Sequence, residues 1–470
     1  MTDAAIDRHF DWDVSQQEAI DRCNDMQQRI VPITGAAGTG KTTIIREVYT
    51  TLTDAGYDVV LCAPTGKAAK RIQEATGIPA QTIHRLLEYP RPGERDDNGD
   101  VLVQSDPRRG KHIKQWDPEE REYYYADRPI PYKVVLADEY AMVNRELHRN
   151  LIDALPPGGR LCMFGDVNQL RPIEQGKYRA DAESPFQAGL RRFNGTVLTT
   201  VHRTTEGSGI AINGERILLG RVPLRRDDFV MRVTEQPVNA LIEVAMDLLE
   251  KGINLGTNVG QIISATRKTW IGTYKLNIAL QDLLNPIGRG MRVRLERHKW
   301  DTTMPISVGV GDKIIWTENA YDLRDWWDRF IDGEPSKGYV PTPPDKIIMN
   351  GESGVITYID PFSNLTIDLG DRIVNVPHKQ TIETKHGGLV DIDPRRTIDL
   401  GFCITTHKAQ GSEWEHVVYV LNKSTMMMQC RSNFYTAISR GRKTATVIAD
   451  QRSLQNSVVQ IVPPIERNRK

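Results

Sequence analysis

The stretch GAAGTGKTT, Gly35 to Thr43, matches the pattern G-x-x-x-x-G-K-T of a phosphate-binding loop. It follows a short apolar run of strand type, RIVPIT, and it precedes KTTIIREVYTTL, which reads as a helix. Backbone N–H groups of such a loop turn inward around phosphate oxygens, and the helix N-terminus adds a positive dipole end. The stretch therefore predicts a nucleoside triphosphate site, in which Lys41 contacts the β- and γ-phosphates and the Thr42 hydroxyl faces magnesium.

Two adjacent acidic residues, Asp138 and Glu139, follow the apolar run YKVVLA. A magnesium-dependent phosphate site needs a carboxylate at a strand end, and neighbouring side chains on an extended chain point to opposite sides. We therefore assign Asp138 to the metal and Glu139 to activation of the attacking water. Most isolated acidic pairs are solvated turns, so this assignment depends on the apolar run before the pair and the phosphate loop upstream.

Two further predicted strands also end in polar residues. The run at 59–63 leads through a turn into a helix, and residues 65–67 lie at the start of that helix, where anions bind. The run at 160–164 is followed by Gln169. An amide just past a strand end can reach the γ-phosphate, and several such loops at one edge of a parallel sheet favour this role over that of a surface loop residue.

Beyond about residue 195 the strand and helix pattern recurs without a phosphate loop. TVLTTVHR reads as a strand ending in Arg203, and GQIISATRKTW as a strand before a helix. GFCITTHKAQGSEWEHVVYVL gives strand, polar turn and strand, and NFYTAISRGRKTATVIAD gives helix, Arg440 and strand. We therefore predict two α/β layers, with Arg203 and Arg440 approaching the nucleotide from the second and stabilising charge on the transferring phosphoryl group.

Composition limits the class of protein. The 470 residues predict several domains, and 39% hydrophobic with 26% charged residues is normal for a soluble globular protein. Because Lys+Arg and Asp+Glu both number 61, any nucleic-acid surface must be a local one. An acidic N-terminus and the lack of a long apolar run predict a cytoplasmic protein without membrane contact. Five scattered cysteines with no C-x-x-C pair predict buried, reduced thiols.

Two segments interrupt the α/β pattern. Residues 88–132 are polar, with a hairpin signal at Asn98-Gly99 and three consecutive tyrosines from Tyr123. Composition alone favours a surface loop there. Residues 291–399 contain the short β-type runs DKIIW, SGVITYI, NLTIDL and DRIVNV, which predict a small barrel.

The order of these motifs resembles superfamily 1 helicases, and within them the RecD/Dda-like group. PTGKAAKRIQEATGIPAQTIHRLL is similar to the second motif of RecD-type proteins, and GDVNQLRP, THKAQGSEW and YTAISR resemble motifs III, V and VI. The resemblance implies an α/β fold of two RecA-like P-loop domains with parallel sheets, plus small inserted β-rich domains, namely a pin-type insert and an SH3-like barrel. It implies a first RecA-like domain at 1–190, which contains the pin-type insert 88–132. It implies a second RecA-like domain formed by 191–290 and 400–470, and an SH3-like domain at 291–399.

The resemblance also implies site residues and partners. ATP and Mg²⁺ would be cofactors, and single-stranded DNA and a duplex fork partners, with single-strand-binding or replication and recombination proteins as candidates. Gln16 matches a glutamine that reads adenine, and Glu413 a residue near the ribose. The predicted nucleotide-binding residues are Gln16, Gly35, Ala36, Ala37, Gly38, Thr39, Gly40, Lys41, Thr42, Thr43 and Glu413. The predicted DNA-binding residues are Pro64, Thr65, Gly66, Lys67, Thr82, His84, Arg171, Thr406, His407 and Lys408.

Some positions depart from the family pattern. Tyr140 and Ala141 follow the acidic pair, where relatives usually have a small residue and then a serine. Arg171 stands where proline is common, and Ala409 replaces a frequent serine. None of these changes removes a group that acts on phosphate, so they bear on the coupling between DNA and ATP.

We interpret the sequence as that of an ATP-dependent DNA helicase that moves 5′-to-3′ on single strands. One alternative is an RNA helicase of the same superfamily, which only nucleic-acid stimulation of ATP hydrolysis would distinguish. A second is a P-loop ATPase that remodels protein complexes, which leaves THKAQGSEW unexplained. A third is a non-catalytic binding module, against which the intact Lys41, Asp138 and Glu139 argue.

Overall fold

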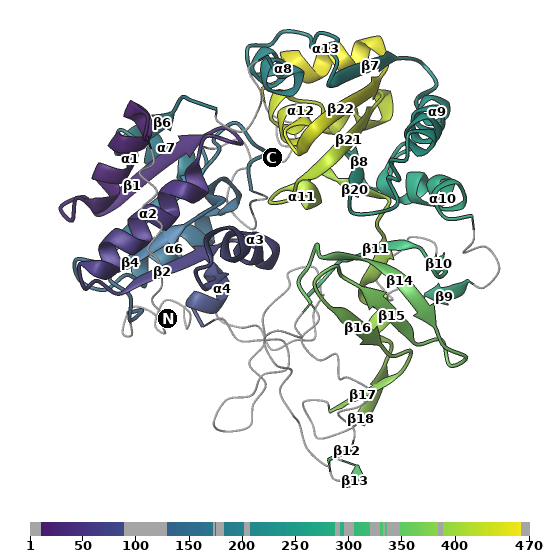
Figure 1. Ribbon diagram of the computed structural model, residues 1–470, viewed down its shortest axis with the longest axis horizontal. Coiled ribbons are helices and arrows are strands. Elements are labelled where there is room, and N and C mark those ends of the chain that lie inside the picture. The colour runs from purple at the N-terminus through teal and green to yellow at the C-terminus, as the bar shows by residue number, and fades with distance from the viewer. Residues whose placement is uncertain are drawn as a thin grey trace, which may run out of the picture.

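The computed structural model describes residues 11–88, 129–172, 174, 183–201, 207–286, 292–295, 305–319, 330–331, 334–335, 348–383 and 389–461. Three bodies are visible in Figure 1: an N-terminal α/β domain, a second α/β domain and a β-rich part below the second. Most of the predicted pin-type insert at 88–132, including Asn98-Gly99 and Tyr123, lies outside the described residues. Its role stays a prediction.

The first domain is built on a parallel sheet with the strand order β3-β2-β4-β5-β1-β6. The strands are β1 (Ile30–Gly35), β2 (Val59–Ala63), β3 (Ala80–Thr82), β4 (Val134–Ala137), β5 (Arg160–Gly165) and β6 (Thr196–Leu198). The helices are α1 (Val14–Asn24), α2 (Lys41–Asp54), α3 (Gly66–Thr76), α4 (Ile83–Leu86), the 3₁₀ turn η1 (Tyr140–Met142), α6 (Arg145–Asp153) and α7 (Pro185–Arg192).

Alternate residues of these strands pack on opposite faces of the sheet. Val134 and Leu136 join a core with α1, α2 and α3, whereas Val135 and Ala137 join a core with α4, α6 and α7. Both faces are therefore covered, and this explains why the strands read as nearly continuous apolar runs in the sequence. The phosphate loop and the acidic pair both follow strands at the carboxyl edge of this sheet.

The second domain has a parallel sheet with the order β20-β8-β21-β22-β7. The strands are β7 (Phe229–Val233), β8 (Gly260–Ser264), β20 (Cys403–Thr405), β21 (Trp414–Leu421) and β22 (Gly441–Ala449). The helices are α8 (Gly209–Leu218), α9 (Pro237–Glu250), α10 (Thr273–Leu284), α11 (Thr406–Ala409), the 3₁₀ helix η6 (Lys423–Met428), α12 (Arg431–Ile438) and α13 (Gln451–Val459). The chain thus forms this sheet from strands on both sides of the 291–399 segment.

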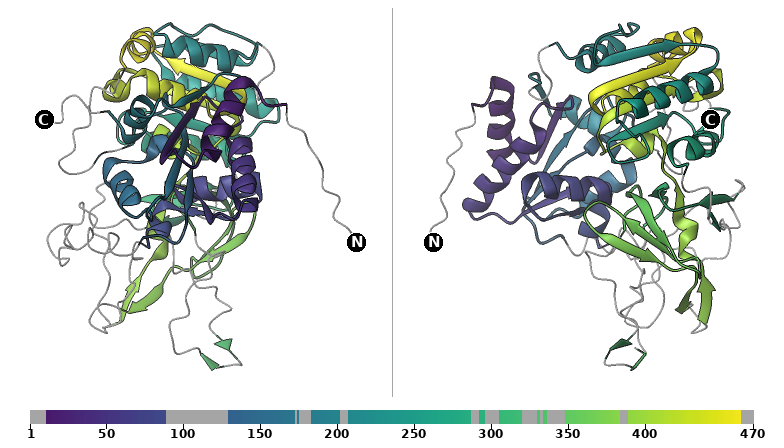
Figure 2. Two further views of the ribbon diagram at one scale, coloured as in Figure 1. Left: turned by 90° about the vertical axis from the view of Figure 1, so that its left-hand side faces the viewer. Right: turned by 45° about the vertical axis from the view of Figure 1, so that its right-hand side comes forward.

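The β-rich part centres on an antiparallel sheet with the order β16-β15-β14-β11-β19. Its strands are β11 (Lys313–Trp316), β14 (Ser353–Ile359), β15 (Leu365–Asp368), β16 (Ile373–Val376) and β19 (Ile398–Leu400), the last following the 3₁₀ turn η5 (Pro394–Thr397). Short ribbons accompany it: β9 (Val293–Leu295) with β10 (Ile306–Val308), β12 (Phe330–Ile331) with β13 (Glu334–Pro335), and β17 (Gln380–Glu383) with β18 (Leu389–Ile392). Figure 2 shows this part below the second domain.

The β-rich part shares its hydrophobic core with the second domain. Trp316 and Ile367 from the sheet belong to the same buried cluster as Leu276 and Leu280 of α10. The buried Lys313 ammonium donates to the carbonyls of Thr257 and Gly260 in the second domain, at 2.7 and 2.9 Å. These contacts make the two a continuous body.

One strand assignment from the sequence is wrong. TVLTTVHR was expected in the second layer, but Thr196–Leu198 pairs in parallel with Ile33–Gly35 as the edge strand β6 of the first sheet. The first domain therefore extends past the predicted boundary at residue 190. A three-residue edge strand carries no signal of which sheet it joins, because that depends on a partner far away in the chain.

The prediction of buried, reduced thiols is confirmed. All five cysteines are buried and carry free thiols. Within the described residues, no helix has the length and apolar character needed to cross a bilayer.

Candidate nucleotide and strand site

The phosphate loop joins β1 to α2 as predicted. Gly40 has φ +83°, and a Cβ added to it would lie 2.6 Å from Nε2 of Gln16, so both backbone and neighbour require glycine there. The Lys41 ammonium donates to the carbonyls of Gly35 and Ala36, at 2.7 and 2.8 Å. The lysine head therefore lies over the loop that precedes it, where the phosphates of a nucleotide would be contacted.

Gln16 is fixed against this loop by the start of α1. Asp13 caps the helix, and the Gln16 side chain closes a capping box by accepting from the Asp13 N–H at 3.2 Å. Its Nε2 donates to the Thr39 carbonyl at 3.2 Å, and the residue is 4% exposed. The structure thus places Gln16 beside the phosphate loop, and its role in reading adenine stays a prediction.

The acidic pair after β4 differs from the expected extended conformation. Glu139 has φ +50°, in the left-handed region, and begins the turn η1. Its N–H donates to Oδ1 of Asp138 at 2.8 Å, and its carbonyl accepts from Met142 at 3.0 Å. The expectation that the two side chains alternate along an extended strand is therefore wrong, because a tight turn starts at Glu139 itself.

Asp138 lies in an environment that disfavours its charge. Burial raises the pKa of its carboxyl from 3.8 to about 6, and the neighbouring Glu139 carboxylate adds to this, whereas the Lys41 ammonium lowers it. A carboxylate that is short of positive charge has a strong electrostatic preference for a cation. Asp138 therefore suits its predicted place beside magnesium.

The donor set fits magnesium, which prefers hard oxygen ligands and retains several waters. Thr42 at the start of α2 offers a hydroxyl. Asp138 offers a buried carboxylate whose negative charge the neighbouring groups do not fully balance. The described residues hold no cluster of three or more His, Cys, Asp or Glu side chains that could cage a metal. One or two protein oxygens together with nucleotide phosphates is the arrangement typical of this ion.

The loop after β5 is bonded to the second domain. The buried Asp166 accepts from the Tyr435 hydroxyl of α12 at 2.7 Å. The Leu170 N–H donates to Thr436 at 2.9 Å, and the Leu170 carbonyl accepts from Gln410 at 3.0 Å. Three hydrogen bonds thus join this loop of the first domain to the second.

Gln169 lies within the same loop. It is 6% exposed, its N–H donates to the Asp166 carbonyl at 3.2 Å, and its side-chain oxygen is buried without a partner among the described residues. A buried amide oxygen without a donor is costly, so it marks a place where a further donor would be stabilising. A phosphate oxygen cannot supply that donor, so the contact between Gln169 and the γ-phosphate stays a prediction.

Of the two arginines predicted to reach the nucleotide, the structure describes Arg440 and not Arg203. Arg440 is 2% exposed, and its guanidinium donates to the Thr436 and Ser412 carbonyls at 3.1 and 3.4 Å. It lies near the interface, because it acts electrostatically on Asp166 of the first domain. Arg203 lies outside the described residues.

Glu413 takes part in contacts that the sequence did not indicate. It is an interdomain ion-pair partner, because Arg71 of α3 in the first domain lies 2.5 Å from its carboxylate. Arg442 of the second domain binds the same carboxylate at 3.0 Å. Burial lowers the pKa of the Arg71 guanidinium, but Glu413, with Glu139 and Asp138, outweighs it and raises that pKa. Arg71 therefore lies within electrostatic reach of the acidic pair.

Two of the threonines predicted to contact DNA are helix caps. The Thr65 hydroxyl accepts from the Ala68 N–H at the start of α3, and Thr82 accepts from Arg85 at the start of α4. A hydroxyl that accepts in this way keeps its own proton, which can be donated to a phosphate oxygen. Pro64 and His84 are half-buried beside these caps.

The start of α3 is covered by the β-rich part. Lys67 donates to the Gly351 carbonyl at 3.3 Å and lies 5.5 Å from the Trp414 ring. Burial lowers the pKa of its ammonium to about 8. A Cβ on Gly66 would lie 2.4 Å from Met349, so this contact requires glycine.

On the second domain, Thr406 departs from the expected role. It is fully buried, and its hydroxyl donates to Asn433 at 2.7 Å, so this side chain serves the core of the domain. Thr405, just before it, caps α11. His407 and Lys408 are half-buried, burial lowers the pKa of His407, and Arg171 is half-buried across the interface.

Together the fold and this site define a P-loop protein with two RecA-like domains. A profile for the AAA domain matches residues 16–175, and one for the UvrD-like helicase C-terminal domain matches residues 400–448. The chain is similar to superfamily 1 helicases of the RecD-like group.

Named relatives support this placement. The chain is 29% identical over 414 residues to the ATP-dependent RecD2 DNA helicase of Deinococcus radiodurans, covering 88% of this chain but only 46% of that relative. It is 25% identical to the RecBCD enzyme subunit RecD of Mycolicibacterium smegmatis, covering 92% and 70%. It is 31% identical to the ATP-dependent DNA helicase dda of Enterobacteria phage T4, covering 33% and 31%.

Solved structures agree on the fold. A structure titled for DNA unwinding at forked duplex by two coordinating Pif1 helicases has a TM-score of 0.54 at 18% identity, with 97% of this chain and 94% of that chain covered. Pif1 helicase from Candida albicans has a TM-score of 0.53 at 18% identity, with 95% and 96% covered.

Proposed function

We propose that the chain hydrolyses Mg-ATP to move 5′-to-3′ along single-stranded DNA and to unwind duplex DNA. The observation that carries this proposal is the set of hydrogen bonds that join the loop after β5 to α11 and α12. Asp166 and Leu170 lie at the nucleotide edge of the first sheet, and their partners Tyr435 and Thr436 belong to the second domain. A change at the nucleotide therefore has a direct route to the second domain.

Each residue at the nucleotide has a distinct task in this proposal. Lys41 neutralises charge on the β- and γ-phosphates, and Thr42 with Asp138 would hold the magnesium ion, which supplies further charge neutralisation when bound. Glu139 orients and deprotonates the attacking water. Gln169 and Arg440 approach from the loop after β5 and from the second domain, where they stabilise the charge that develops on the transferring phosphoryl group.

The strand would be held by the threonine caps, Lys67 and the α11 end, at the carboxyl edges of the two sheets. Relatives named as DNA helicases, and a solved neighbour titled as Bacteroides Pif1 bound to single-stranded DNA, support DNA as the track. The direction of movement is inferred from the family resemblance. The proposed domain division follows the three bodies, with the first domain extended through β6.

The test is ATP hydrolysis with and without nucleic acid. Turnover should rise on adding an oligothymidine and much less on adding a matched RNA oligonucleotide; an equal response would favour an RNA helicase, and no response a protein-remodelling ATPase. Duplexes with a 5′ or a 3′ single-stranded tail then test direction. Unwinding confined to 3′-tailed substrate would contradict the proposed polarity.

A further inference from the structure

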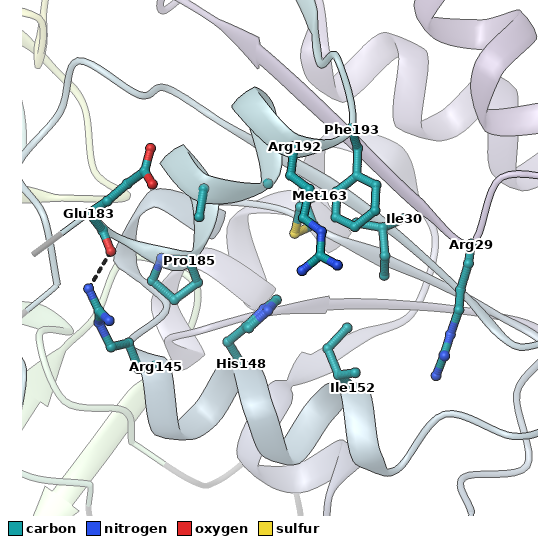
Figure 3. A pocket seen from close by; sticks show the side chains of 12 residues that line it. Arg29, Ile30, Arg145, His148, Ile152, Met163, Glu183, Pro185, Arg192 and Phe193 are labelled. Carbon is teal, nitrogen blue, oxygen red and sulfur yellow. Dashed lines mark hydrogen bonds between the residues drawn. The ribbon is translucent and has the colours of Figure 1, made fainter.

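A hollow lies between α6 and α7, on the face of the first sheet that these helices cover. Figure 3 shows Arg145, His148 and Ile152 on one side of it and Arg192 and Phe193 on the other. Its volume is about 520 Å³, within the range of ligand clefts. We call this hollow the α6–α7 groove; its apolar lining includes Ile30, Ile152, Met163, Pro185 and Phe193.

The rim of the groove carries uncompensated positive charge. Arg29 and Arg192 are exposed, and no carboxylate within the described part of the chain pairs with either. Arg145 donates to the Glu183 carbonyl at 2.5 Å, and Arg191 binds the Glu183 carboxylate at 3.0 Å. Because Arg191 already neutralises the rim carboxylate, Arg29 and Arg192 give the rim a net attraction for anions, with the Arg192 guanidinium 5.6 Å from the centre of the Phe193 ring.

A second hollow continues beyond Arg29. It has a volume of about 450 Å³ and shares Arg29 with the α6–α7 groove. Pro129, Pro156 and Pro157 line it. Two hollows that share one arginine fit an extended occupant with an anionic group between two contact points.

The groove is separate from the nucleotide and strand site. It contains Ile30, the first residue of β1, whereas the phosphate loop follows Gly35 at the other end of that strand. Five residues of strand span roughly 16 Å. An occupant of the groove would therefore neither block the nucleotide nor use the strand contacts already described.

We propose that the α6–α7 groove binds an extended acidic segment of a partner protein that carries at least one bulky apolar side chain. The apolar side chain would fill the lining around Ile152 and Met163, and acidic residues would face Arg29 and Arg192. Arginine binds carboxylates in a bidentate manner, so these two positions give orientation as well as attraction.

The chemistry favours a peptide over other anions. A nucleic-acid strand brings a phosphate with every residue and gains affinity from stacking on aromatic rings, whereas the lining of the α6–α7 groove is mainly aliphatic and offers only the rings of His148 and Phe193. A small inorganic anion would leave the apolar lining unused.

The test measures binding of peptide pools to the full chain by fluorescence anisotropy. Three pools of amidated, fluorescein-labelled hexapeptides are compared: acidic with leucine or phenylalanine, acidic with serine, and lysine-rich with leucine or phenylalanine. We expect the first pool to bind at least about tenfold more tightly than either of the others. Similar binding of all three pools would overturn the proposal.

Variants then locate the binding. Arg29→Glu combined with Arg192→Glu should weaken binding of the first pool by about tenfold or more, since both changes place a negative charge against the peptide. Arg225→Glu, which reverses another exposed arginine away from the groove, is the matched control. Equal loss in the control would show non-specific charge attraction and refute the site. Loss of oligothymidine binding in the double variant, without peptide discrimination, would assign the groove to nucleic acid instead.

Discussion

Glu139 has a backbone conformation that its residue type rarely adopts. At φ +50° it is one of four non-glycine residues with positive φ in the described chain, and it directly follows Asp138 at the end of β4. Such conformations cost about 1–3 kcal/mol and persist where the surroundings impose them. The turn therefore sets the backbone of Glu139 apart from the strand that ends in Asp138.

Replacing Glu139 with glutamine should separate nucleotide binding from hydrolysis. The amide keeps the size of the side chain but cannot take a proton from water, so turnover should fall by roughly a hundredfold or more. Binding of a fluorescent ATP analogue should be retained because Lys41 and Asp138 are intact. Turnover near the wild-type value would show that another group activates the water.

His148 gives the first domain a predictable response to pH. Burial lowers the pKa of its imidazole from 6.5 to about 4, and its Nδ1 lies 2.8 Å from the Tyr140 hydroxyl. Between about pH 6.5 and about pH 4 the imidazole is protonated in the unfolded chain but not in the folded chain. The free energy of unfolding therefore decreases as pH falls through this window. Over this window the loss amounts to at most about 3 kcal/mol.

His148→Gln should reduce this acid sensitivity. Thermal unfolding of wild type and variant is compared at pH 7.5 and pH 5, and the variant should lose less of its unfolding temperature at pH 5. His378→Gln, at an exposed position, is the control for general effects of removing a histidine. An unchanged difference between the two pH values in His148→Gln would show that the imidazole is not the group responsible.

At the scale of elements, α3 joins all three bodies of the molecule. Lys70 pairs with Glu352 and Asp371 of the β-rich part at 3.2 and 2.6 Å. Arg71, on the next position of the helix, pairs with Glu413 of the second domain. Since α3 also begins with the residues expected at the strand, it is placed to report strand binding to both neighbours.

Arg71→Ala tests the contact with the second domain. The buried Glu413 carboxylate would keep its pair with Arg442 and lose its pair with Arg71 of the first domain. We expect stimulation of ATP hydrolysis by oligothymidine to fall several-fold while hydrolysis without DNA changes little. Arg442→Ala is the matched control, because it removes a partner of the same carboxylate without crossing the interface. Equal loss of stimulation in both variants would point to Glu413 alone rather than to the interdomain link.

The sequence predicted the strands and motifs better than it predicted the contacts between distant segments. Strands such as Val59–Ala63 and Arg160–Gly165 were located because strands covered on both faces are continuous apolar runs ended by polar loops. The spacing of the phosphate loop located Lys41, and the apolar run before the acidic pair located Asp138. The turn at Glu139, the sheet joined by β6 and the pairing of Arg71 were missed, because each depends on segments far apart in the chain or on a local turn without a distinctive composition.

At the scale of the whole molecule, the two α/β domains meet through a small set of polar contacts. The Tyr435 hydroxyl reaches across to Asp166, whose pKa burial raises and whose charge this hydrogen bond stabilises. A buried carboxylate that loses a donor costs about 1–3 kcal/mol. The arrangement of the domains seen here should therefore be sensitive to this one hydroxyl.

Tyr435→Phe removes the hydroxyl and keeps the ring in the second domain's core. The arrangement in which Asp166 faces α12 should become less favourable by about 1–3 kcal/mol, which is a shift of roughly five- to a hundredfold in the population of that arrangement. ATP binding to the first domain should be retained, whereas the DNA-stimulated turnover should fall because it requires both domains together.

The control for this change is Tyr419→Phe. The Tyr419 hydroxyl is also buried and donates to Asn433 at 3.0 Å, but both residues lie within the second domain. It should lower the unfolding temperature without changing the ratio of turnover with and without oligothymidine. If Tyr435→Phe lowers the unfolding temperature alone and leaves that ratio unchanged, the Asp166 contact is structural. If the ratio falls in Tyr435→Phe and not in Tyr419→Phe, the hydrogen bond between the domains is part of the coupling between strand and nucleotide.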